Sequence, residues 1–448
     1  MASQLLDHIH EHILDNGLKV ISLQKDSSPI VSVQVWYKTG SINERNGIRG
    51  ISHILEHMMF RGSKNVPSED HSHRISDVGG HCNAFTSEDI TAYVNSVPGE
   101  HLEMVLALES DRMQHITLDP ALLAIERTVI IEEFHTYMNN PVAKAFLEFR
   151  QAMYANHPYA TSPLGTRADI SAVTAEDCRA YYNEWYTPDN AILVVVGDFK
   201  STGELLRLCH QYFGDIKNGL STRSHERQSP IPPPSFDKPQ RMIRKVDFDV
   251  PMLILGYPAP SAMQTQALPI EIAQLAVSQG ETSRLHHSIV REQSLAVMVG
   301  GVNLCLNRSG ISLFFAAFTP DKSAARIEQA ISQQIQTMTT EGLRDDEIEK
   351  IKNATLTSRI FELYSAEHIC QRIGYAETVE GDWHMWVKRL DALQKLDNNT
   401  LRTTIQEYWK QSARQVLYLK PKRINPLLWG FAIFNRIVSL RPKGKKSV

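Results

Sequence analysis

The sequence predicts two similar α+β domains, each a mostly antiparallel sheet covered by helices, in a chain of 448 residues. Strand-like and helix-like patterns follow one another in the same order in both halves. A proline-rich segment separates the halves, and each is long enough to bury a core of its own. We therefore predict domains at 1–222 and 240–420, a linker at 223–239 and a C-terminal tail at 421–448.

The first half contains apolar or alternating stretches typical of strands, at 19–23, 31–37, 92–97 and 191–196. Asn16-Gly17 is a hairpin-turn signal before the first of them. Pro120 is expected at the start of a helix over 121–137, where its missing N–H costs nothing. Thr174 and Asp177 form a capping-box pattern that starts a further helix.

The second half repeats this scheme, with strands predicted near 242–247, 252–257, 296–304, 311–318 and 415–419 and helices near 322–340 and 345–363. Neither a helix nor an interior strand can pass through the linker, because it contains prolines 230, 232, 233, 234 and 239.

The composition excludes several classes of protein. With 47 Lys+Arg, 50 Asp+Glu and 42% hydrophobic residues, the chain is not disordered, collagenous or a polytopic membrane protein. A net charge of −3 gives no electrostatic basis for binding nucleic acid, so no nucleic acid partner is expected. The 5 cysteines are scattered singly, which predicts reduced thiols.

The two ends bear on localisation. The N-terminus lacks the basic and apolar regions of a secretory signal, so we expect a cytoplasmic protein; a periplasmic one requires a leader that was removed. The tail carries basic residues and an apolar run at 427–434, too short to span a bilayer. It is a candidate for peripheral membrane contact; the alternative is packing on its own domain or on a partner chain.

The most informative segment is His53-Ile-Leu-Glu56-His57, in an amphipathic pattern that predicts a helix ending before Gly62. Residues four apart share a helix face, so His53 and His57 project together with Glu56 close beside them. Imidazole nitrogens suit Zn²⁺, and a catalytic zinc usually takes three protein ligands. A third ligand must come from another segment.

The best candidates for that ligand lie on the helix after Pro120. Glu126 and Glu133 are seven residues apart and share a face, whereas Glu132 points about 100° away from Glu133. We assign Glu133 as the ligand and Glu126 as its support, with Glu132 as the alternative ligand.

Four blocks of this sequence together resemble the pitrilysin family of zinc metallopeptidases, in particular its mitochondrial-processing-peptidase-like branch. The inverted zinc motif HxxEH lies in the first of these blocks, at 50–63, and the others are at 79–94, 126–141 and 186–199.

The resemblance implies peptide-bond hydrolysis with one Zn²⁺ per chain. His53, His57 and Glu133 correspond to the zinc ligands, Glu56 to the general base and Glu126 to the supporting carboxylate. The residues Asn83, Ala84 and Phe85 fall where the family pairs an edge strand with an extended peptide substrate.

One position departs from the family pattern. Members that bind substrate with the second domain carry an arginine followed by a tyrosine; this chain keeps Arg291 but has Val297 at the tyrosine's place. We therefore keep three alternatives: an active zinc endopeptidase, which as a homodimer needs no other chain; a subunit active only in a heterodimer with a related chain; and a non-catalytic interaction subunit.

Other polar residues receive plainer interpretations. His71, His73 and His81 match no ligand position and are interpreted as polar loop residues. Arg284 and Arg291 are each either a helix-end cation or a substrate-facing residue.

Overall fold

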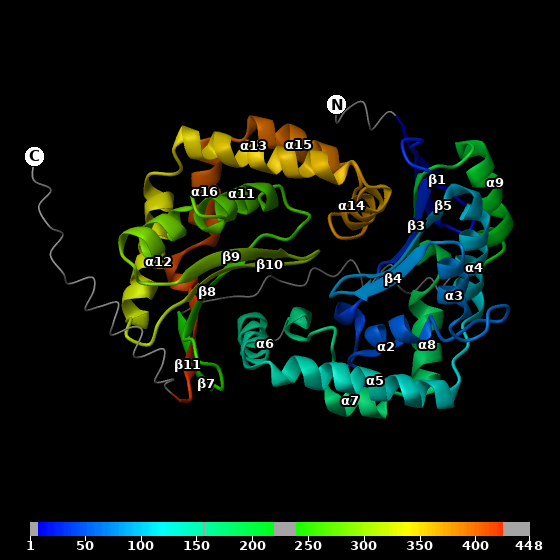
Figure 1. Cartoon of the computed structure of the whole chain (residues 1–448), viewed down its shortest axis with the longest axis horizontal. Helices are drawn as coiled ribbons and strands as arrows, with labels where there is room; N and C mark the ends of the chain where they lie inside the picture. Colours follow the sequence, from blue (N-terminus) through cyan, green and yellow to red (C-terminus); the bar gives the residue numbers. More distant parts are fainter. Residues whose placement is uncertain (1–7, 156, 219–238, 424–448) are drawn as a thin grey trace, which may run out of the picture.

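The computed structural model describes residues 8–155, 157–218 and 239–423. It contains two sheets, each covered by helices, in two halves that lie side by side in Figure 1. Most of the predicted linker and nearly all of the predicted tail lie outside the described residues. Within those residues, no helix is long and apolar enough to cross a membrane.

The first half is built on a six-stranded sheet with the order β1-β2-β6-β3-β5-β4. All neighbouring pairs are antiparallel except β2 with β6. Its strands are β1 Ile9–Ile13, β2 Lys19–Gln24, β3 Ile30–Tyr37, β4 His81–Thr86, β5 Thr91–Pro98 and β6 Ala191–Gly197. Because β4 ends the order, it is an edge strand.

The helices of the first half pack on the sheet around one core, to which both strands and helices contribute residues such as Val33, Leu55 and Val195. They are α2 Ile51–Met58, α3 Asp70–Asp77, α4 Leu102–His115, α5 Pro120–Asn139, α6 Pro141–Tyr154, α7 Arg167–Ala172, α8 Ala175–Trp185 and α9 Thr202–Phe213. The predicted capping box is present: the Thr174 hydroxyl accepts from the Asp177 N–H, and the Asp177 carboxylate from the Thr174 N–H.

The second half is built on a five-stranded sheet with the order β7-β11-β8-β10-β9. Its single parallel pair joins β7 to β11. The strands are β7 Gln240–Val246, β8 Met252–Ala259, β9 Met298–Cys305, β10 Gly310–Ala317 and β11 Gln415–Pro421. The helices are α11 Ala267–Ser278, α12 Ala324–Thr340, α13 Asp345–Glu362, α14 Ala366–Thr378, α15 Met385–Lys395 and α16 Asn398–Tyr408.

The two halves share one topology, as their similar patterns predict. Leaving out β1, each sheet places its first strand beside its fifth, followed by the second, the fourth and the third. The edge strand β4 of the first half therefore corresponds to β9 of the second. Both carry a helix beside them, α2 and α11 respectively.

Each half also covers the sheet of the other. Helix α14 packs against β3 and β6 of the first sheet, and α6 packs against β7 and β11 of the second (Figure 1). Ile373 of α14 shares a buried cluster with Trp36 and Val194, and Phe149 of α6 shares another with Leu417. This exchange of helices holds the two halves together through apolar burial.

One expectation about local structure is wrong. His71 and His73 lie on α3 and His81 lies on β4, so none of the three is a loop residue. His71 is buried and its Nε2 lies 3.0 Å from Asn95 Oδ1, which satisfies it inside the domain. The stretch His286–Glu292 forms a π-helical segment, which the sequence pattern does not predict.

Candidate metal centre and peptide cleft

Helix α2 is fixed by the burial of one face and by hydrogen bonds at its first turn. Its apolar residues Ile51, Ile54, Leu55 and Met58 are fully buried, which leaves His53, Glu56 and His57 on the opposite face. Gly50 takes a positive φ of 95° at the start of the helix, a conformation that favours glycine. The buried carboxylate of Glu44 accepts hydrogen bonds from Gly50 N at 2.8 Å and Ser52 N at 3.0 Å, capping the helix.

Helix α5 lies against α2 and supplies the acidic residues. It begins as predicted, with Pro120 in the first turn and the Asp119 carboxylate accepting from Ala121 N at 2.6 Å. Glu126 is buried on this helix, and Glu133 follows two turns later on the same face.

His53, His57 and Glu133 offer ligand atoms that all lie within 4.8 Å of one another. Glu133 Oε2 is 3.5 Å from His53 Nε2 and 3.7 Å from His57 Nε2. Ligands of a tetrahedral zinc, with bonds of about 2.0–2.2 Å, are separated by about 3.3–3.6 Å. The three residues therefore fit a zinc ion in both donor type and spacing.

Glu132 does not join this cluster. Its side chain is 72% exposed and lies 3.7 Å from His135 on the other side of α5. The geometry favours Glu133 over Glu132 as the third member of the group.

Glu126 connects His57 to an arginine that the sequence reading did not single out. Its Oε2 lies 3.0 Å from His57 Nδ1, and its Oε1 lies 2.5 Å from Arg61 Nη2. The Glu126 side chain is only 3% exposed, so its charge needs these partners. An Nδ1–H donated to Glu126 leaves Nε2 of His57 free to face Glu133.

Glu56 is held beside the cluster by the edge strand. Thr86 Oγ1, on β4, donates a hydrogen bond of 2.5 Å to Glu56 Oε2. Burial raises the pKa of Glu56, although the Thr86 hydroxyl and the nearby His57 oppose the shift. A carboxyl with a raised pKa is better suited to take up and return a proton near neutral pH.

His53 is poised to act as a neutral ligand. Burial, assisted by the neighbouring His57, lowers the pKa of His53 to about 4. The imidazole is therefore uncharged at neutral pH and its lone pair is available.

A cleft of about 520 Å³ opens in front of these residues. It is lined by Glu56, His57, Phe60, Arg61, Glu69, Ser72, His73, Cys82, Asn83, Ala84 and Glu126. The predicted substrate residues Asn83 and Ala84 therefore line the same cleft as Glu56 and His57. Phe85 does not line this cleft and packs near Trp36, with ring centroids 5.4 Å apart.

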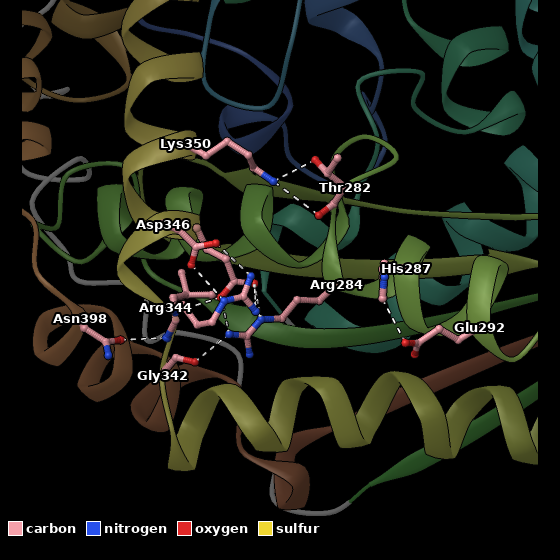
Figure 2. A network of polar contacts seen from close by, with 11 residues as sticks. Thr282, Arg284, His287, Glu292, Gly342, Arg344, Asp346, Lys350 and Asn398 are labelled. Carbon is pink, nitrogen blue, oxygen red and sulfur yellow. Dashed lines mark hydrogen bonds and ion pairs between the residues drawn. The ribbon is translucent and has the colours of Figure 1, made fainter.

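The arginines of the second half take different places. Arg284 is fixed within its own domain, donating to Glu347 at 2.6 and 2.9 Å and to Gly342 O at 3.0 Å. Figure 2 shows Arg284 beside Gly342. Arg291 is half exposed and lies 2.5 Å from Glu281. Val297 is 61% exposed. The contacts of Arg284 therefore favour a structural role over a substrate-facing one. For Arg291 the substrate-facing role stays a prediction.

Comparison with known families identifies the chain. The model for Insulinase (Peptidase family M16) matches residues 19–167, and that for the Peptidase M16 inactive domain matches residues 172–355. The chain belongs to peptidase family M16. The metal cluster lies in the part that matches the first model.

Relatives of similar length carry zinc protease names. The zinc protease PqqE of Helicobacter pylori is 27% identical over 422 residues, covering 92% of this chain and 93% of the relative. The uncharacterized zinc protease YmxG of Bacillus subtilis is 25% identical over 373 residues, covering 83% and 89%.

Solved structures show the same architecture. A protease from Helicobacter pylori superimposes with a TM-score of 0.84 at 26% identity, over 92% of this chain and 99% of that one. The periplasmic protease PqqL from Escherichia coli, at 20% identity and a TM-score of 0.76, covers 95% of this chain but only 48% of its own. This chain therefore has the fold of about half of PqqL.

Proposed function

We propose that this M16 chain is a zinc-dependent endopeptidase that hydrolyses extended peptides or unfolded protein segments. The observation that carries the proposal is the convergence of His53, His57 and Glu133, next to a cleft that Glu56 and His57 line. These residues would hold one Zn²⁺, which when bound supplies Lewis-acid polarisation and lowers the pKa of a water molecule.

The side chains of the chain divide the remaining work. Glu56 accepts the proton of the attacking water and returns it to the leaving amine, while Thr86 holds its carboxylate in place. Glu126 orients His57 through Nδ1. The free edge of β4 binds the peptide backbone as an added strand, so Asn83 and Ala84 lie along the substrate.

The direct test combines metal analysis with peptide cleavage by the full chain. We expect about one zinc per chain, hydrolysis of an unfolded protein substrate, loss of both after chelation and recovery on adding Zn²⁺. A zinc-loaded chain that cleaves no peptide, alone or with a related chain, would refute the catalytic proposal.

A second candidate is a subunit that needs a related chain for activity. Two observations favour it: Val297 stands exposed where a tyrosine is expected, and PqqL contains about twice the length that this chain matches. Under this candidate, the purified chain cleaves poorly, and a related chain that has the tyrosine increases the rate. Robust turnover by the isolated chain would argue against it.

A purely non-catalytic interaction role has less support, because His53, His57 and Glu133 form a group that could hold a metal ion and Glu56 lies on the same helix as the two histidines. The name of PqqL describes a periplasmic protein, and a periplasmic place for this chain is a proposal that rests on that name.

A further inference from the structure

The edge strand β4 separates two different surroundings. Its even-numbered side chains face α2 and α3: Cys82 Sγ lies 3.5 Å from Ser72 Oγ, and Thr86 bonds Glu56. Two odd-numbered side chains face α14 of the other half: His81 Nδ1 is 3.9 Å from Glu367, and Phe85 packs with the apolar cluster to which α14 contributes. Asn83, at the exposed edge between them, also borders the zinc-side cleft.

A second pocket, of about 380 Å³, lies on the α14 side of the strand. Trp36 and Phe85 contribute from the first half, and Tyr375 of α14 contributes a third aromatic ring from the second. The remaining lining residues are Glu362, His368, Gln371 and Arg372. Its volume is at the lower end for ligand sites, which suits one side chain.

The charged residues of this pocket are already held in ion pairs. Arg372 lies 2.9 Å from the buried Glu380, and Glu362 lies 3.0 Å from Arg359. Since these charges are balanced, the aromatic rings dominate the chemistry that an entering group meets. Aromatic rings favour other aromatic groups through edge-to-face and stacked contacts.

We infer that this α14 pocket is a substrate subsite for a large aromatic side chain. The inference rests on the proposed function, because the ligand is a peptide strand added to the free edge of β4. Successive side chains of such a strand point to opposite faces of the sheet. One therefore enters the zinc cleft and the next enters the α14 pocket.

The subsite lies close to the scissile bond. Phe85, which lines the α14 pocket, directly precedes Thr86, which bonds the proposed base Glu56. The second half would thus contribute to peptide selection through α14, even though the metal cluster belongs to the first half.

The first test maps the bound peptide without requiring turnover. The full-length Glu56→Gln variant, loaded with zinc, is incubated with extended peptides that carry photoreactive benzoylphenylalanine at successive positions. We expect cross-links to α14 at every second position and cross-links to α2 or α3 at the positions between. Absence of α14 cross-links, or cross-linking without a period of two, overturns the inference.

The second test measures selectivity in the active protein. Among peptides varied around the scissile bond, we expect Phe or Tyr to be preferred over Ala by about tenfold at the α14 position. Gln371→Glu should raise the relative rate for Lys at that position by about three- to fivefold, as expected for one exposed charge pair. The matched control, Gln333→Glu on the exposed face of α12, should leave selectivity unchanged.

The two tests separate the two proposals. Alternating cross-links without any hydrolysis support the subsite and contradict the peptidase. Hydrolysis with equal rates for Phe and Ala, and no response to Gln371→Glu, overturns the subsite and leaves the peptidase standing.

Discussion

The two halves of the chain share one strand order but differ in the helix beside the edge strand. In the first half, α2 carries two histidines and a glutamate on one face, and Glu56 and His57 line a cleft of about 520 Å³. In the second half, α11 occupies the corresponding place and buries ten of its twelve residues, chiefly apolar ones. A cleft of about 610 Å³ lies there too, lined by Glu271, Gln274 and the glycines 300 and 301 of β9.

This difference separates the features that both halves share, which come from the topology, from those that depend on particular side chains. In each half, the topology places a cleft beside an edge strand, β4 in the first and β9 in the second. In the described residues, however, a group of His, Cys, Asp or Glu side chains that could hold a metal ion occurs only at His53, His57 and Glu133. Function therefore resides in side chains placed on a repeated scaffold, in keeping with the general separation of fold and function.

The strongest test of the comparison replaces one glutamate in each cleft. Glu56→Gln keeps the shape of the side chain but cannot accept a proton, so we expect kcat to fall by about 10²–10⁴ with zinc retained. Glu271→Gln, the matched change beside β9, should leave kcat within about twofold. Substantial turnover by pure Glu56→Gln protein would contradict the assigned base.

The next test concerns the metal. Glu133→Ala removes one of three protein ligands, so we expect most of the zinc to be lost during dialysis and peptide cleavage to disappear with it. Glu132→Ala, one residue away and 72% exposed, is the control and should retain its zinc. Full zinc occupancy in Glu133→Ala would place the third ligand elsewhere.

Arg61 offers a more graded perturbation. It lies 2.5 Å from the buried Glu126, which contacts His57. Removing a residue that hydrogen-bonds a metal ligand directly, as Glu126 would for His57, usually costs about 10- to 100-fold in metal affinity. Because Arg61 acts one contact further out, we expect Arg61→Leu to weaken zinc binding by about tenfold and Arg61→Lys to recover part of it, as measured by competition with a fluorescent chelator. Equal affinities in all three proteins would show that Glu126 needs no cation.

How far the sequence predicts this site depends on how far apart its residues lie. His53, Glu56 and His57 belong to one helix, so their shared face follows from helical spacing alone. The same holds for Glu126 and Glu133 on α5. The meeting of α2 with α5 needed the family resemblance, because helical spacing relates only residues of the same helix.

The contacts that were missed all join distant segments. Thr86 reaches Glu56 only because β4 pairs at the sheet edge beside α2, and Arg61 reaches Glu126 across two helices. The α14 pocket requires the exchange of helices between halves, for which the sequence carries no local signal. Periodicity and capping residues act locally, so nine strands, the helices α2, α5, α12 and α13 and the start of α8 were predictable, whereas β1, β4 and the remaining helices were not assigned from the pattern.

The last prediction concerns the acid stability of the first half. In the first half, burial and the nearby guanidinium of Arg112 lower the pKa of His71 to about 3. Its Nε2 lies 3.0 Å from Asn95 Oδ1, and the Asn95 amide donates to Glu109, which is itself paired with Arg112. Asn95 Oδ1 is thereby left as the acceptor, so the neutral His71 donates its Nε2–H.

Because the unfolded chain protonates His71 below pH 6.5 while the folded chain does not, the folded state loses stability as the pH falls from 6.5 toward 3. This residue contributes a slope of about 1.4 kcal/mol for each pH unit well below 6.5. Urea unfolding of the zinc-free chain between pH 7 and 4 should show a shallower decline for His71→Gln than for the parent protein. An unchanged slope in His71→Gln would mean that other groups, such as His53, account for the acid sensitivity of the first half.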